Sequence, residues 1–308
     1  MYYFIINPKS RTGLGKQIWH TVQKQLKEWN IPYSYYYTHY EFHAVKLAKE
    51  ICNTHNGIKK IVVIGGDGTM NEVINGISSY EDVLLGYIPS GSSNDLARGL
   101  AIPSDPVKAL KRIVNGKHFR YTDHGCLQLK GNHEMRKFAV SSGIGFDADI
   151  CYEALDSPLK KFLNKLKLGK LTYGAIAIKQ LIRFQPFDAE FIIDGTTTMK
   201  LSNVFFAASM IHSCEGGGLH LAPHAKANDR KLSVCIFYDI PKWKAIFLLP
   251  SLLFGLHQYL SKGVKLFDCS TLSIKTTSPV VLHTDGEFAG RDKHVTLSCT
   301  KEQVRMLL

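Results

Sequence analysis

Short apolar runs alternate with segments of helical periodicity over the first third of the chain. The runs at residues 2–6, 60–64 and 83–88 are rich in β-branched and aromatic residues, as buried strands are. After the first run, Ile18, Val22 and Leu26 recur at helical spacing. A further strand near 34–37 and a helix around 45–51 continue the alternation. Strands that alternate with helices predict a parallel sheet with helical crossovers, whose ligands bind beyond the carboxyl ends of the strands.

The pattern changes after about residue 120, where strands predominate. We expect strands at residues 138–144, 189–193, 203–208, 232–237, 271–275, 280–283 and 295–299. Asp194-Gly195 has the composition of a hairpin turn. Helical segments at 157–183 and 242–260 interrupt the strands. With 308 residues, the chain is long enough for two domains, an α/β domain followed by a mostly β domain.

Three glycines within four positions follow the strand at 60–64, and a helix then begins. Glycines allow close backbone approach to a ligand, and the N–H groups of a helix start favour an anion such as phosphate. Asp67 stands among these glycines and would repel a bare phosphate, so we expect a divalent cation between them. The stretch therefore predicts a magnesium nucleotide site, with an ordinary turn as the alternative. It is neither a Walker A loop nor a full dinucleotide fingerprint, because Asn71 occupies the third glycine position.

The net charge indicates the class of partner, and the cysteines indicate the cellular compartment. The formal net charge of +12 favours a polyanion, either nucleic acid or an anionic membrane face. Nucleic acid is disfavoured because neither zinc-finger spacing nor an RNP motif occurs. The seven cysteines form no C-x-x-C pair, and the chain starts directly with a strand, so we expect reduced thiols in a cytoplasmic protein.

Two segments raise the question of membrane contact. Residues 245–256 are apolar, contain Pro250 and are too short to span a bilayer; a buried helix is favoured, and contact with lipid is the alternative. Residues 157–187 hold basic side chains interleaved with leucines, which fits either a solvated helix face or an anionic membrane surface. The basic residues are Lys160, Lys161, Lys165, Lys167, Lys170, Lys179 and Arg183.

Six motifs, taken together and in this order, resemble the catalytic domain shared by diacylglycerol kinases, sphingosine kinases and bacterial lipid kinases of the YegS type, with NAD kinases as distant relatives. They are Asn7-Pro8-Lys9-Ser10, Gly65-Gly66-Asp67-Gly68-Thr69 with Asn71-Glu72, Gly91-Ser92-Ser93-Asn94-Asp95, Gly143-Ile144-Gly145-Phe146-Asp147-Ala148, Gly216-Gly217-Gly218 and Asp285-Gly286-Glu287. The resemblance implies a Rossmann-like nucleotide domain over residues 1–122, to which residues 300–308 return. It also implies a mostly antiparallel β-sandwich with inserted helices over residues 123–299, which holds the lipid substrate.

The resemblance also implies an ATP site in the cleft between the domains. The residues expected to line it are Asn7, Pro8, Lys9, Ser10, Arg11, Thr38, Gly65, Gly66, Asp67, Gly68, Thr69, Met70, Asn71, Glu72, Ser92 and Asn94. Arg11 replaces a common glycine, where it would gain a phosphate contact or crowd the loop, and Ser92 replaces a common threonine but keeps the hydroxyl.

The implied catalytic and metal-binding groups are carboxylates. Asp67, Asp95 and Asp123 would form an acid and magnesium network, and of Asp285 and Glu287 the latter is the expected proton acceptor. The structural alternatives are Asn94-Asp95 as a helix cap, Asp123 as a loop acid and Asp285-Gly286 as a hairpin turn.

A second, structural magnesium is also implied, at Asp229 with the carbonyls of Lys226 and Lys231. Asn228 and Arg230 replace the usual acid and glycine there, which weakens the site.

The resulting hypothesis is an ATP- and Mg²⁺-dependent lipid kinase whose expected substrate is diacylglycerol. It would act at the cytoplasmic face of the membrane as a peripheral protein; whether it forms a homodimer is open. A sphingoid base or phosphatidylglycerol is the alternative substrate. A catalytically inactive nucleotide- or membrane-binding regulator is the alternative class of protein.

Overall fold

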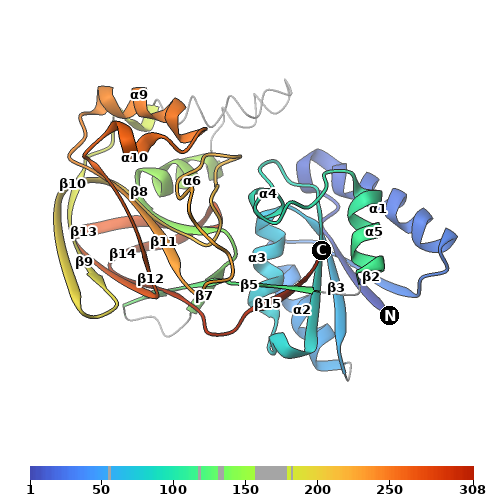
Figure 1. Ribbon diagram of the computed structural model, residues 1–308. Helices are drawn as coiled ribbons and strands as arrows, with labels where there is room; N and C mark the ends of the chain where they lie inside the picture. Colours follow the sequence, from blue (N-terminus) through green and yellow to red (C-terminus); the bar gives the residue numbers. More distant parts are fainter. Residues whose placement is uncertain (55–56, 117–118, 131–134, 157–178, 182) are drawn as a thin grey trace.

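Figure 1 shows two lobes side by side, each built on its own sheet. The computed structural model describes residues 1–54, 57–116, 119–130, 135–156, 179–181 and 183–308. The first sheet has the strand order β2-β1-β3-β4-β15-β5 and is parallel except for β5. Its strands are β1 (Tyr2–Ile6), β2 (Tyr33–Tyr37), β3 (Lys59–Gly65), β4 (Val83–Pro89), β5 (Phe119–Thr122) and β15 (Val304–Leu307).

Helices cover both faces of this sheet, which explains why its central strands are apolar throughout. On β1, Tyr3 and Ile5 face one core, whereas Phe4 and Ile6 face the other. α2 (His43–Thr54), α3 (Asp67–Gly76) and α4 (Asp95–Gly99) pack on the first face. α1 (Ser10–Glu28) and α5 (Pro106–Asn115) pack on the second. A 3₁₀ turn, η1 (Tyr80–Asp82), precedes β4.

The second lobe is antiparallel, with the strand order β12-β11-β10-β8-β13-β14-β6-β7. β9 pairs with both β10 and β13, and both of these pair with β8, so four strands close into a small barrel. The strands are β6 (Gly125–Leu129), β7 (Met135–Phe138), β8 (Ser141–Gly145), β9 (Phe187–Ile193), β10 (Thr197–Met210), β11 (Leu232–Tyr238), β12 (Val264–Cys269), β13 (Thr271–Thr284) and β14 (Glu287–Cys299). The helices are α6 (Phe146–Asp156), α9 (Lys242–Leu252) and α10 (His257–Leu260).

The fold class expected from the sequence is confirmed, although several boundaries differ. The strand expected at 138–144 is two strands, β7 and β8, because Ala139 and Val140 direct their backbone N–H groups to the carboxylate of Asp285. The strands expected at 271–275 and 280–283 form one strand, β13, with an irregular register between Lys275 and Val280.

The helix expected over 242–260, with its apolar part 245–256 favoured as buried, differs in two ways. Pro250 lies inside α9, and the chain leaves the helix after Leu252, with Gly255 at a φ of +66°. Leu248 and Leu252 are buried, but Phe247 and Phe254 are 72% and 74% exposed, so the prediction of a buried helix is wrong for one face. No helix among the described residues is long and apolar enough to cross a membrane.

Most of the basic segment predicted at 157–183 lies outside the described residues, including Lys160, Lys161, Lys165, Lys167 and Lys170. Of the described part, Lys179 forms an ion pair with Glu153.

The lobes meet along α3. The Asn71 side chain donates to the Lys137 carbonyl at 2.8 Å and to Asp285 at 2.8 Å, both in the second lobe. One turn later, the Asn75 side chain donates to the Lys137 carbonyl at 3.0 Å and accepts from the Lys137 N–H at 2.9 Å. α3 starts at the loop of residues 65–68, called the glycine loop below. These contacts therefore fix the second lobe relative to that loop.

Candidate active site

Three loops meet at the carboxyl edge of the first sheet because β1, β3 and β4 are adjacent and parallel. The Asn7 side chain donates to the Thr69 hydroxyl at 3.1 Å. This hydrogen bond joins the loop after β1, called the first loop, to the glycine loop. The hydroxyls of Ser10 and Ser90 lie 2.7 Å apart, and the Ser90 N–H donates to the Gly65 carbonyl at 2.7 Å. Thr38 follows β2 at the same edge, and its N–H donates to the Ile6 carbonyl. The predicted crevice is therefore assembled from these loops.

The glycine loop and the loop after β4 touch backbone to backbone. A Cβ placed on Gly91 would lie 2.6 Å from the Gly66 Cα, and a Cβ on Gly66 would lie 3.1 Å from the Gly91 Cα. Position 91 therefore requires glycine, and a side chain at position 66 would require the Gly91 backbone to shift. The contact holds Gly66 directly before the first turn of α3. The N–H groups at that helix start suit a phosphate.

The first loop has three consecutive residues in the left-handed region. Arg11, Thr12 and Gly13 have φ values of 42°, 60° and 96°. Only the last is glycine, so Arg11 occupies a conformation that costs a non-glycine residue about 1–2 kcal/mol. Arg11 is exposed beside the crevice, so the substitution of the common glycine introduces backbone strain and brings a cation to the site.

Asp67, which is half-buried, and Asp95, which is buried, form one acidic network. The Asp67 carboxylate accepts from the backbone N–H groups of Asp95 at 2.9 Å and Leu96 at 3.3 Å, and from the Tyr87 hydroxyl at 3.3 Å. The Asp95 carboxylate forms an ion pair with Arg98 and accepts from the Gly217 N–H at 2.9 Å. Burial, followed by the charges of Asp95 and Asp285, raises the pKa of Asp67 to about 6. A buried carboxylate beside other acids fits a divalent cation, because the cation would relieve that repulsion.

Asp285 has no oxygen left for a reacting proton. Its carboxylate accepts from the N–H groups of Ala139 at 2.8 Å, Val140 at 2.7 Å and Ser141 at 3.0 Å, in addition to the Asn71 amide. Its φ of +50° and that of Gly286 at +80° form the tight turn between β13 and β14. Burial raises the pKa of Asp285, and the four donors oppose that shift.

Glu287 lies on the other side of this turn and is exposed. Its Oε1 atom is 3.0 Å from where a Cβ on Gly68 would stand, so the second lobe places this carboxylate against the glycine loop. The charge of Glu287 also acts on the guanidinium of Arg136, which donates to the Phe288 carbonyl at 2.7 Å. A cavity of about 350 Å³ opens beside these residues, between the helices of the first lobe and the second lobe. Its walls include Phe42, Glu72, Arg136 and Ala289.

Several residues predicted to bind ATP also have contacts within the protein. Met70 is fully buried in the core, so only its backbone can face the crevice. The Glu72 carboxylate accepts from the Ala44 N–H at 2.9 Å and thereby joins α3 to α2. Asn94, at a φ of +53°, uses its side chain to bridge the N–H and the carbonyl of Gly91. Ser92, Lys9 and Pro8 remain at the crevice surface.

Asp123 is not brought to the Asp67 network by any hydrogen bond that the structure describes. Its carboxylate accepts from the Arg230 N–H at 2.7 Å and from the Gln303 side chain at 2.7 Å, and its own N–H donates to the Ala227 carbonyl. These contacts anchor the loop at 223–231 and the segment that leads to β15.

The residues around Asp229 fit a structural cation poorly. Asp229 is exposed, and its carboxylate already accepts from the Lys231 N–H at 3.1 Å. Lys226, Arg230 and Lys231 bring three positive side chains to a loop with this one carboxylate. Arg230 also has a φ of +60°, a conformation that suits the glycine it replaces.

Three positions that contribute to the site were not among the residues predicted to form it. Tyr87 and Gly217 support the two acids, and Gly91 contacts Gly66. Gly217 and Gly91 lie in glycine-containing motifs that were noted, but their partners are distant in the sequence; nothing in the sequence around Tyr87 indicates its role.

Comparisons with known proteins identify the relatives of this chain. Residues 1–125 match the diacylglycerol kinase catalytic domain, and residues 149–307 match the YegS C-terminal NAD kinase beta sandwich-like domain. YtlR of Bacillus subtilis, described as a candidate lipid kinase, is 30% identical over 291 residues, which is 94% of each chain. The diacylglycerol kinase of Bacillus subtilis is 30% identical over 232 residues, covering 75% of this chain and 71% of that protein. The resemblance inferred from the motifs is thereby confirmed.

One solved structure has the same fold across nearly the whole chain. It is the structure of a candidate diacylglycerol kinase from Bacillus anthracis, with a TM-score of 0.76 at 19% identity. The match covers 99% of this chain and 96% of that one.

The contact between the two glycines can be tested by Gly91→Ala. The added methyl group would collide with the Gly66 backbone, which cannot move as a flexible side chain can. We expect the variant to fold but to lose most of the thermal stabilisation that Mg-ATP gives the wild type, as measured by differential scanning fluorimetry. Gly195→Ala, in an open hairpin turn of the second lobe, is a control. Equal stabilisation of the Gly91 variant and the wild type would contradict the assignment.

Proposed function

The chain belongs to the diacylglycerol kinase catalytic domain family of lipid kinases, and we propose that it transfers the γ-phosphoryl group of ATP to the hydroxyl of diacylglycerol. The product would be phosphatidic acid. The observation that carries the proposal is the position of Glu287, a second-lobe carboxylate, against Gly68 in the loop that suits phosphate. This arrangement places a proton acceptor from one lobe beside a phosphate cradle from the other.

The crevice loops supply the nucleotide end of the reaction. Backbone N–H groups at the start of α3 would bind phosphate oxygens, and the exposed cations of Lys9 and Arg11 would balance the remaining charge. Asp67 and Asp95 are the residues that would hold a magnesium ion, directly or through water. When bound, such an ion neutralises phosphate charge.

The lipid end of the reaction depends on Glu287. The hydroxyl oxygen attacks the γ-phosphorus, the bond from that phosphorus to the β–γ bridging oxygen breaks, and ADP leaves with that oxygen. The hydroxyl proton passes to the Glu287 carboxylate. Asp285 does not take the proton in this scheme, because its oxygens already accept four N–H groups. Its role is to fix the turn that carries Glu287.

Diacylglycerol is preferred as the substrate because a relative of 30% identity is named a diacylglycerol kinase. A sphingoid base or phosphatidylglycerol would present a hydroxyl of the same chemistry, and these are the alternative substrates. An inactive regulator is disfavoured because Asp67, Asp95 and Glu287 are all present at the crevice.

Membrane attachment through the α9–α10 face, defined by the exposed side chains of residues 243–260, is part of the proposal. The face lies at one end of the second lobe (Figure 1) and exposes large apolar groups that water would not favour. They are Trp243, Ile246, Phe247, Leu253, Phe254, Leu256, Tyr259 and Leu260. Lys244 lies within this face, and Lys262 lies beside it in the sequence. Apolar groups with neighbouring lysines suit the interface of an anionic membrane.

Phosphate transfer from γ-labelled ATP to a panel of lipids in mixed micelles tests the proposed substrate. We expect labelled phosphatidic acid from diacylglycerol at a kcat/KM at least about tenfold above that for sphingosine or phosphatidylglycerol, because the active-site geometry should discriminate between acceptors. Preferential labelling of another lipid would identify that lipid as the substrate in place of diacylglycerol. Labelling of no lipid would contradict a catalytic function.

The separate roles of Glu287 and Asp285 predict two different phenotypes. Glu287→Gln should lower kcat by about 10²- to 10⁴-fold with little change in ATP affinity, because a general base acts in the transition state. Asp285→Asn would place an NH₂ group against two of the four N–H donors and should lower the free energy of unfolding by roughly 3 kcal/mol. Steady-state kinetics and urea unfolding measure the two effects. Normal turnover in Glu287→Gln would rule out its role as the base.

The α9–α10 face predicts salt-tolerant binding to lipid. A variant with Phe247→Glu and Phe254→Glu should lose most of its co-sedimentation with vesicles of phosphatidylglycerol and phosphatidylcholine, while phosphorylation of a short-chain soluble substrate is retained. Ile58→Glu, a matched change at an apolar residue that is 61% exposed in the first lobe, should bind like the wild type. Undiminished binding of the double variant would place the membrane contact elsewhere.

A further inference from the structure

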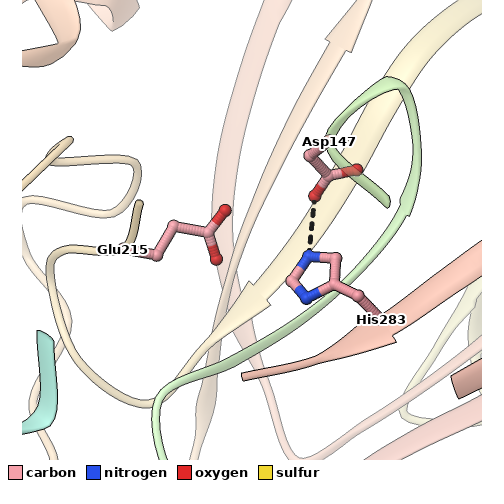
Figure 2. A group of neighbouring side chains, drawn as sticks. All are labelled: Asp147, Glu215 and His283. Carbon is pink, nitrogen blue, oxygen red and sulfur yellow. Dashed lines mark hydrogen bonds and ion pairs between the residues drawn. The ribbon is translucent and has the colours of Figure 1, made fainter. Parts of the chain in front are cut away.

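Asp147, Glu215 and His283 converge in the second lobe behind the β13–β14 turn (Figure 2). One ligand atom from each residue lies within 4.8 Å of the other two. The His283 Nε2 and Asp147 Oδ2 atoms are 3.1 Å apart. The three residues come from separate elements, namely the first turn of α6, the loop after β10 and the strand β13. Their meeting is therefore a product of the tertiary fold.

The surrounding chain makes room for this cluster. A Cβ on Gly143 would lie 2.0 Å from Asp147 Oδ2 and 2.5 Å from His283 Nε2, so only glycine fits there. His283 is 2% exposed, and the Asp147 side chain is 15% exposed. Glu215 is held by a paired turn with Leu219, in which each N–H donates to the other's carbonyl. Gly143 thus leaves room for Asp147 and His283, and the turn fixes the backbone of Glu215.

One carboxylate oxygen of Glu215 lacks a hydrogen-bond partner among the described residues. This atom, Oε2, is inaccessible to solvent. A buried carboxylate oxygen without a partner costs free energy, so a bound group is expected where it points. In Figure 2 the carboxylate faces the imidazole edge and the Asp147 carboxylate across the intervening space.

The charges of the cluster call for a cation. Two carboxylates and a neutral imidazole carry a net charge of −2, which a divalent ion would balance. One imidazole nitrogen with two carboxylate oxygens is a ligand set suited to Mn²⁺ or Zn²⁺, whereas Mg²⁺ favours oxygen alone.

We propose that Asp147, Glu215 and His283 bind one divalent transition-metal cation through His283 Nε2 and one oxygen of each carboxylate. This site is separate from the cation that accompanies ATP at Asp67. A separation of 3.1 Å between Nε2 and Oδ2 matches two ligands of one ion with bonds of about 2.1 Å.

Cation binding would also alter the contact to the turn that carries Glu287. The Gly286 N–H donates to His283 Nδ1 at 3.3 Å, a long hydrogen bond. With a cation on Nε2, the imidazole proton would move to Nδ1, and this contact would be lost. The site is therefore linked through one hydrogen bond to the turn that positions the proposed base.

Electron paramagnetic resonance of the full-length, nucleotide-free protein with Mn²⁺ tests the proposal. We expect a bound Mn²⁺ whose pulsed spectrum contains modulation from a directly coordinated ¹⁴N, because the oxygen-only site for ATP cannot supply it. Glu215→Gln changes only the carboxylate without a described partner at Oε2 and should weaken this ion's affinity at least about tenfold. His283→Gln should remove the nitrogen modulation.

Asp149→Asn is the matched control, since it removes an acid from the same turn of α6 but outside the cluster; it should retain the nitrogen-coupled ion. The absence of any nitrogen-coupled Mn²⁺ in the wild type would overturn the proposal without recourse to a variant. A nitrogen-coupled ion that persists in both His283→Gln and Glu215→Gln would also overturn it. Neither result depends on lipid kinase activity, so the test is independent of the proposed substrate.

Discussion

The Asp285 carboxylate, which accepts hydrogen bonds from both lobes, is the interaction on which the arrangement of the site depends. Three of its donors are consecutive backbone N–H groups between β7 and β8, and the fourth is the Asn71 amide on α3. Hydrogen bonds to a charged group contribute about 1.5–3 kcal/mol each, which offsets the cost of burying the carboxylate. Because α3 begins at the glycine loop, the same bonds set the distance between that loop and Glu287.

The glycine loop imposes a second constraint, since it must approach both a neighbouring loop and a ligand. Gly66 contacts the Gly91 backbone, and Gly68 faces Glu287, so each glycine leaves room for a different neighbour. Asp67 between them is half-buried with its charge opposed by nearby acids, which raises its pKa. The protein therefore holds a carboxylate at a free-energy cost that a bound cation would lower. Phosphate transfer requires charge neutralisation at that same position.

The sequence predicted the features that depend on local pattern. The parallel sheet followed from alternating apolar runs and helices, and the crevice followed from glycine and polar residues at the ends of β1, β3 and β4. β5 and β15 were not predicted as strands, because they are four residues long and are defined by pairing across about 180 positions of sequence. Only the return of residues 300–308 to the first domain was expected, from the resemblance. The contact from Asn71 to Asp285 spans 214 positions and has no local signal. The α9 segment is apolar on all sides, so its periodicity does not indicate which face the barrel covers.

A double-mutant cycle on kcat between Asn71 and Glu287 tests the central claim that α3 positions the base through Asp285. Asn71→Ala and Glu287→Gln are measured singly and together, at a temperature where circular dichroism shows that all variants are folded. If Asn71 acts by positioning Glu287, the double variant should be no slower than Glu287→Gln alone, because no base then remains to be positioned. Losses in kcat that multiply in the double variant would show that the two residues act independently and would contradict the account.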